Sequence, residues 1–121
     1  MTFDWTHGPL AEGLHLYHSG EFFAAHEAWE SIWLTAPAPE KAFLQALIQI
    51  AAACHHLQRD NLLGTARLLH TALRRLDPYP PNFAGIDTSL LRNDIRRCLE
   101  TLAAVEATAP ITPPRIHRLC P

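Results

Sequence analysis

Five polar side chains lie in two segments of the chain that are otherwise apolar. His26 and Glu30 belong to the segment FFAAHEAWESIW, and Gln45, Gln49 and His56 belong to the segment FLQALIQIAAACHHLQ. At about 100° per residue of helix, His26 and Glu30 are about 40° apart, and the other three residues share a second arc of about 40°. An unpartnered buried polar group costs about 1–3 kcal/mol. Two such stripes facing each other would therefore require a bound ion, a ligand or a hydrogen-bond network.

The types and spacing of these residues suit metal binding, because an imidazole and a carboxylate one helical turn apart can reach the same point. Catalytic zinc usually has three protein ligands, and non-haem iron has two His and one carboxylate. We therefore predict that His26, Glu30 and His56 bind one divalent metal ion of unknown identity. Gln45 and Gln49 would orient these ligands, and a metal-bound water would make the chain a metal-dependent hydrolase.

Two other interpretations of the same residues remain open. The stripes could form a buried hydrogen-bond network, so that the chain is a non-catalytic helical interaction module with tetratricopeptide-like hairpins, and such a module could be a homodimer. The stripes could also bind a small polar molecule without chemistry. Trp29 and Trp33 flank the first stripe, and we expect core aromatics there rather than a ligand cage, although both would line a pocket if one forms.

The composition restricts the class of protein. With 121 residues, 48% hydrophobic residues and a formal net charge of −2, the chain suits one soluble globular domain. This charge gives no general attraction to nucleic acid or to an anionic membrane. The longest apolar stretch is too short to cross a bilayer, the N-terminus lacks the features of a secretory signal, and the three widely spaced cysteines suit a reducing compartment. We therefore expect a cytoplasmic protein that binds neither nucleic acid nor membrane.

Glycine, proline and Asx residues divide the chain into five predicted helices, and no stretch shows the alternation that a strand requires. The predicted helices cover residues 9–19, 21–34, 40–59, 62–76 and 87–105. The third is apolar around most of its circumference, which is typical of the central helix of a bundle. We therefore predict an all-α fold, a five-helix bundle of antiparallel helical hairpins.

Two segments of the chain are predicted to lie outside the helices. The proline-rich segment 77–86 would run over the surface as a connection. A single helical domain would span residues 1–109, and residues 110–121 would form an extended proline-rich tail. That tail would either pack on the bundle through Ile111 and Ile116 or stay loose.

Several of these residues together match a known family pattern. The motif His26-x-x-x-Glu30-x-x-Trp33 follows the sequence GEFF and precedes both LQALIQIAAA and the sequence NLLG that starts at Asn61. Over residues 10–76 this pattern resembles the DUF309 family, which consists of small all-helical bacterial and archaeal proteins without an established activity. The resemblance implies a metal-binding role for the motif, which maps here onto His26, Glu30 and Trp33.

Overall fold

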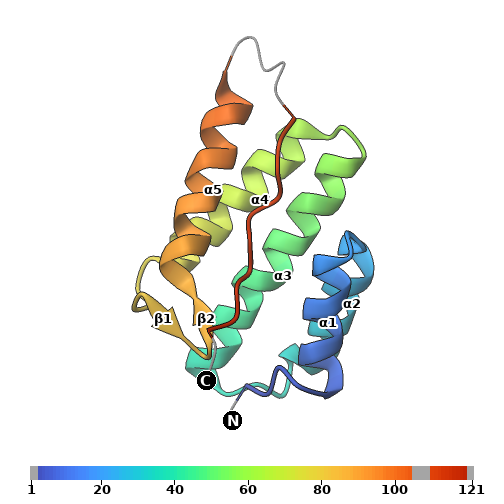
Figure 1. Cartoon of the computed structure of the whole chain (residues 1–121), viewed down its shortest axis with the longest axis vertical. Helices are drawn as coiled ribbons and strands as arrows, with labels where there is room; N and C mark the ends of the chain where they lie inside the picture. The colour runs from blue at the N-terminus through green and yellow to red at the C-terminus, as the bar shows by residue number, and fades with distance from the viewer. Residues whose placement is uncertain (1–2, 105–109, 120–121) are drawn as a thin grey trace.

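The computed structural model describes residues 3–104 and 110–119, and its five α-helices confirm the predicted all-α bundle (Figure 1). The helices are α1 (Gly8–His18), α2 (Phe22–Trp33), α3 (Ala38–Gln58), α4 (Leu62–Leu76) and α5 (Thr88–Ala103). A two-stranded antiparallel hairpin, β1 (Asn82–Phe83) and β2 (Ile86–Asp87), lies between α4 and α5. Within the described ranges, no helix is long and apolar enough to span a membrane.

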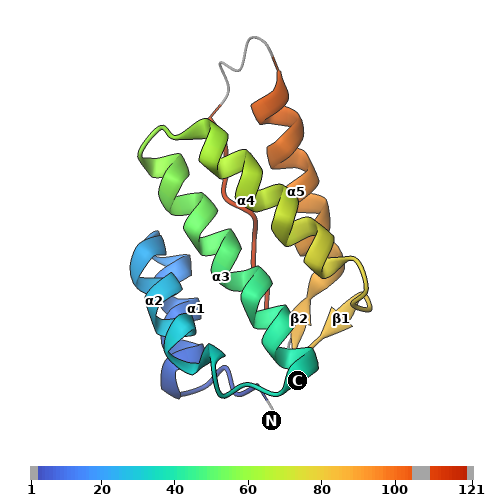
Figure 2. The ribbon, with the colours of Figure 1, turned by 180° about the vertical axis from the view of Figure 1, so that it is seen from behind.

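α3 is the central helix, as its apolar circumference predicts. α1 and α2 pack on one side of α3, α4 packs on the other side, and α5 packs on α4 (Figures 1 and 2). The fully buried side chains of α3 include Phe43, Leu44, Leu47 and Ile50. Gln45 and Gln49, the polar residues in the middle of α3, are only partly exposed.

Local sequence signals explain where the helices begin and end. Gly20 has φ +79°, a conformation that glycine adopts without steric cost, and it turns the chain between α1 and α2. The side chain of Asn61 accepts a hydrogen bond from the backbone N–H of Gly64, and that of Asp87 accepts one from Leu90, each at 3.0 Å. These N-caps satisfy backbone donors at the starts of α4 and α5.

The close approach of α1 and α2 depends on Gly13. A Cβ at this position would lie only 2.2 Å from Nε1 of Trp29, so a larger residue would collide with the indole. Trp29 is fully buried there and donates a hydrogen bond from Nε1 to the carbonyl of Leu10 at 3.2 Å. Trp29 is therefore a core aromatic, as expected, and its indole N–H is already satisfied.

The segment 77–86 is more ordered than a surface connection. It contributes β1 and the start of β2, and it buries the side chain of Ile86 completely. Strands of two residues have no detectable alternation, so a periodicity argument could not reveal them.

Residues 110–119 run in an extended path along the bundle and pack on it (Figure 1). Ile116 is fully buried, Ile111 is partly buried against the core, and Arg118 forms a backbone bridge with Ile86. The predicted end of the fifth helix at residue 105 and the predicted domain boundary at residue 109 lie outside the described residues.

Candidate functional site

His26 and Glu30 lie together on α2, as their spacing predicts. Nε2 of His26 and Oε1 of Glu30 are 3.5 Å apart. The His26 side chain is 22% exposed and the Glu30 side chain is 55% exposed. The His26 ring also stacks on Phe23, with ring centroids 5.8 Å apart. The pair thus lies at the border between core and solvent, where a ligand can reach it.

Three buried polar atoms on α2 and α3 have no hydrogen-bond partner among the described residues. They are Nδ1 of His26, Nε1 of Trp33 and Oε1 of Gln49. Each such atom lowers the free energy of unfolding by about 1–3 kcal/mol if nothing satisfies it. Because buried polar groups are nearly always paired, three of them on two neighbouring helices indicate that water or a ligand completes their hydrogen bonds.

α2 and α3 run antiparallel (Figure 1), and the contact between Trp33 and Lys41 sets their register. Nζ of Lys41 lies 4.4 Å from the centroid of the Trp33 ring. His26 is seven residues before Trp33, and Gln49 is eight residues after Lys41. At about 1.5 Å per residue, both therefore lie about 10–12 Å further along the interface. We call this row of polar side chains, namely His26, Glu30, Trp33, Gln45 and Gln49, the α2–α3 seam.

A pocket of about 480 Å³ opens at the end of the α2–α3 seam where α3 begins. Its lining residues are Trp33, Ala38, Lys41, Ala42, Gln45 and Arg75, and we call it the Trp33 pocket. Within the described ranges, neither Lys41 nor Arg75 forms an ion pair. Two cations beside an apolar wall suit an organic anion, since charge-assisted hydrogen bonds to an anion are the strong ones.

Two of the predicted site residues, Trp33 and Gln45, line this pocket, whereas sequence reasoning does not select its cations. An arginine in the last turn of α4 is explained by its favourable interaction with the helix dipole. The sequence pattern of α4 therefore gives no reason to assign Arg75 to a ligand site. A signal for Lys41 does exist, because it lies four residues before Gln45 and eight before Gln49. Extending the polar stripe of α3 backwards by one turn would therefore have identified the lysine.

His56 does not join the α2–α3 seam. Its Nδ1 lies 3.1 Å from Nδ2 of Asn61, at the turn between α3 and α4. The spacing places His56 on the same arc as Gln49, but His56 is seven residues beyond Gln49 and therefore about 10.5 Å further along α3. In the part of the chain that the structure describes, no three His, Cys, Asp or Glu side chains are grouped to hold a metal ion. The predicted set of His26, Glu30 and His56 is thus not assembled, although its His26–Glu30 half is.

Comparisons with known proteins identify a similar family and a relative without supplying an activity. The family model described as "Domain of unknown function (DUF309)" matches residues 10–68, which confirms the resemblance seen in the sequence. The matched range contains the His26–Glu30 pair, Trp33 and all of α3. An uncharacterized protein of Aquifex aeolicus (strain VF5) is 30% identical over 93 residues, a range that covers 76% of this chain and 28% of the relative. The chain thus spans little more than a quarter of that relative's length.

Proposed function

We propose that this chain, whose residues 10–68 match the DUF309 family, binds a small organic anion in the Trp33 pocket and along the adjoining α2–α3 seam. The observation that carries the proposal is a set of three buried polar atoms, on His26, Trp33 and Gln49, that have no hydrogen-bond partner among the residues that the structure describes. A purely structural network would pair these atoms with other protein groups, and within residues 3–104 and 110–119 none of the three has such a partner.

The chemistry of the pocket defines the class of ligand. Nζ of Lys41 and the guanidinium of Arg75 would bind a carboxylate or phosphate group, because cations without an acidic partner form strong charge-assisted hydrogen bonds with anions. The first turn of α3, which begins at Ala38, adds the positive end of a helix dipole. Ala42 and the indole of Trp33 provide apolar area for the ligand's carbon skeleton.

The remaining seam would bind the polar part of the ligand or the waters that accompany it. Nε1 of Trp33 can only donate a hydrogen bond, and Oε1 of Gln49 can only accept one. Gln49 lies about 12 Å from Lys41 along α3 and does not line the Trp33 pocket, so a small ligand such as a hydroxy acid or a sugar phosphate would accept the hydrogen bond of Trp33, and water would donate to Gln49. The fixed polarity of Nε1 of Trp33 therefore determines that an acceptor group of the ligand faces the indole.

Titration calorimetry with small carboxylates and phosphate esters at low ionic strength tests this proposal. Lys41→Met and Arg75→Met should each weaken binding by about tenfold or more, because a hydrogen bond to a charged group contributes about 1.5–3 kcal/mol. Arg74→Met is the matched control, since Arg74 is the exposed neighbour of Arg75 and does not line the pocket. Equal affinities in all three variants would contradict the proposal.

A second candidate function is binding of one divalent metal ion by His26 and Glu30, as the family motif implies. It is favoured by the 3.5 Å separation of their Nε2 and Oε1 atoms. Two side chains are fewer than the three protein ligands of a typical catalytic zinc site, so the bound anion or water would complete the coordination. The ion would supply Lewis acidity for hydrolysis of an ester or amide of that anion, while Gln45 and Gln49 would orient the pair.

Elemental analysis of protein purified without a histidine tag distinguishes the two candidates. Metal binding predicts about one ion per chain, lost in His26→Ala and in Glu30→Ala but retained in His56→Ala. If the anion binds without metal, treatment with a chelator should leave the affinity for the anion unchanged.

A further inference from the structure

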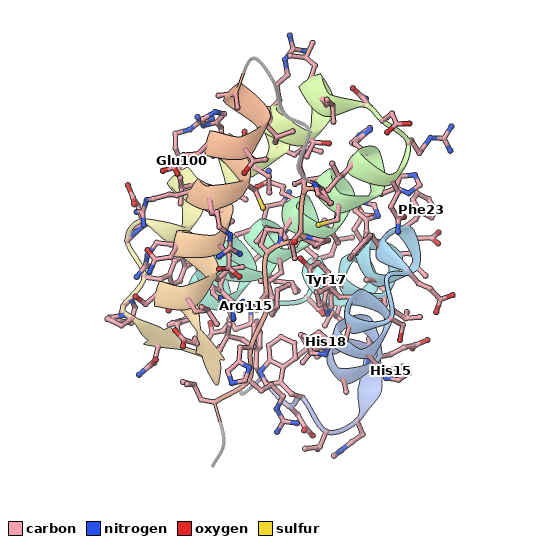
Figure 3. The ribbon with its side chains drawn as sticks, turned by 45° about the horizontal axis from the view of Figure 1, so that its top comes forward. His15, Tyr17, His18, Phe23, Glu100 and Arg115 are labelled. Carbon is pink, nitrogen blue, oxygen red and sulfur yellow. The ribbon has the colours of Figure 1, made fainter. Side chains whose placement is uncertain are left out.

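The extended tail segment, residues 110–119, lies between α1 and α5 and in front of α3 (Figure 1). The residues that line the Trp33 pocket do not include any of this segment, and the proposed anion site makes no use of it. Side chains of α1 and α5 form hydrogen bonds with the segment, and Figure 3 places Tyr17, His18 and Arg115 together there. We call the region that holds the segment the α1–α5 groove, formed by Tyr17, His18, Asp94, Cys98 and the β hairpin.

The groove binds the backbone of the tail segment at alternate residues. Sγ of Cys98 donates to the carbonyl of Thr112 at 3.0 Å, the hydroxyl of Tyr17 donates to the carbonyl of Pro114, and Nε2 of His18 donates to the carbonyl of Ile116 at 2.9 Å. Alternate carbonyls point the same way in an extended chain. These contacts therefore recognise an extended backbone rather than particular side chains.

The β hairpin continues this pattern towards the end of the segment. The backbone N–H of Asp87 donates to the carbonyl of His117, and the N–H of Leu119 donates to the carbonyl of Gly85, both at 2.9 Å. With the bridge between Ile86 and Arg118, this is the addition of a short strand to a sheet edge, a common mode of peptide recognition.

One side chain of the segment is recognised specifically. Arg115 makes two hydrogen bonds to the carboxylate of Asp94, from Nε to Oδ2 at 2.8 Å and from an Nη to Oδ1 at 3.2 Å, and its backbone N–H donates to Oδ2 at 2.9 Å. Asp94 is 1% exposed and also pairs with Arg97 at 3.1 Å. Burial opposes ionisation of Asp94, but the hydrogen bonds from Arg115 outweigh it and lower the pKa of the carboxyl below its ordinary value.

Two further features suit a peptide that binds and leaves. Pro113 and Pro114 restrict the segment to extended conformations before it binds, which lowers the entropy lost on binding. A cavity of about 500 Å³ remains beside the segment, between residues 113–117 and the end of α1. The segment therefore has an open side, although Ile116 itself is fully buried.

We propose that the α1–α5 groove is a binding site for an extended Thr-Pro-Pro-Arg-Ile segment, and that residues 112–119 of a second copy of this chain can occupy it in exchange for the chain's own. The segment seated in the groove belongs to this chain, so every second copy carries the same ligand with the same complement of hydrogen-bonding groups. Exchange of an identical element between two copies creates a dimer without any new type of contact.

Charge reversal at one contact tests the exchange. Asp94→Arg and Arg115→Asp each place like charges between a groove and its own tail segment. In an equimolar mixture, the groove of either variant finds a tail segment of opposite charge only on a chain of the other variant. Native mass spectrometry and light scattering should then detect a heterodimer in the mixture, and a monomer for the double variant Asp94→Arg/Arg115→Asp, in which the reversed pair is restored within one chain.

The controls separate exchange from other effects. Glu100 lies on α5 away from the groove (Figure 3), so Glu100→Arg mixed with Arg115→Asp should give no heterodimer. If the double variant folds as a monomer and the mixture of single variants contains no heterodimer, the exchange proposal is overturned.

Asp94 is buried, so Asp94→Arg alone could prevent folding, and a second measurement avoids this substitution. Arg115→Ala weakens the hold of the groove on its own segment. A fluorescent peptide of residues 111–119 should bind this variant, and the same peptide with aspartate at position 115 should bind about tenfold more weakly or worse. Absence of binding by the unaltered peptide, or equal binding by both peptides, would contradict the proposal.

Discussion

The α1–α5 groove and the α2–α3 seam both bury polar groups, but they satisfy them differently. In the groove, the carboxylate of Asp94 pairs with Arg97 and receives three hydrogen bonds from Arg115. In the seam, polar atoms of His26, Trp33 and Gln49 have no partner within the described parts of the chain. Both regions contain buried polar atoms, so they differ in whether these atoms have hydrogen-bond partners and not in whether they are buried.

This contrast distinguishes polar residues that stabilise the fold from polar residues that are available to bind a ligand. Groups that are fully paired within the chain contribute to stability, and removing one partner is costly. Groups that are buried and unpaired reduce stability until something binds them. Removing one buried polar group should therefore lower the free energy of unfolding in the groove and raise it in the seam.

The largest effect is expected for Asp94→Ala. Removing one partner of a buried ion pair typically costs about 3–5 kcal/mol. We expect a loss of about 3 kcal/mol in the free energy of unfolding, because Arg97 and Arg115 are 54% and 60% exposed and keep much of their hydration. Urea denaturation measures this change. Asp77→Ala, at an exposed aspartate, should change stability by less than about 0.5 kcal/mol, and a similar loss in both variants would remove the distinction.

A smaller effect follows from the titration of Asp94. The pKa of its carboxyl is lowered in the folded chain, so its contribution to stability is fully present above the unfolded-state pKa of about 3.9. That contribution is lost as the pH falls through the lower pKa of the folded state. The stability difference between the wild-type chain and Asp94→Asn should therefore be constant from pH 7 to about pH 5 and should shrink below about pH 4. A difference that grows on acidification would contradict the assignment.

Gln49→Leu should increase stability. It removes a buried oxygen that has no hydrogen-bond partner among the described residues, and we expect a gain of about 1 kcal/mol in the absence of ligand. The matched control is Gln58→Leu on the same helix, because Gln58 donates a hydrogen bond to the carbonyl of Gly20 at 2.9 Å. That variant should lose stability. If thermal denaturation shows that both variants lose stability, Gln49 is satisfied in solution and the seam does not differ from the groove.

An effect of similar size is expected at Asn61, the N-cap residue of α4. Asn61→Ala removes the N-cap of α4 and should cost about 1 kcal/mol, whereas Asn61→Asp retains the cap and should cost less. Neither variant should alter binding at the Trp33 pocket, since His56 and Asn61 lie apart from it. A change of ligand affinity in either variant would indicate that His56 contributes to the functional site.

Features that repeat along the sequence or cap an element could be predicted. The periodic leucines and the Asn61 cap predict α4 with the same bounds as the structure, and the one-turn spacing of His26 and Glu30 predicts their contact. The two-residue strands have no periodicity, and the contact of Gly13 with Trp29 depends on how two helices pack. Both are tertiary effects, so a pattern within one segment could not contain them.

The assignment of His56 shows a different limit. An angular argument places residues on a face of a helix but takes no account of distance along its axis. His56 shares the arc of Gln49 and still lies about 10.5 Å away along α3. Lys41 shows the converse, because it shares the stripe of Gln45 and lies close enough along the helix axis for its side chain to line the pocket.

The most direct test of the central claim is a high-resolution crystal structure of the untagged chain grown with the tightest-binding organic anion from the calorimetric screen. We predict density for the anion between Lys41 and Arg75, with an acceptor atom within hydrogen-bonding distance of Nε1 of Trp33, about 2.7–3.2 Å. An α2–α3 seam in which protein groups alone satisfy His26, Trp33 and Gln49, with no anion in the Trp33 pocket, would contradict the account.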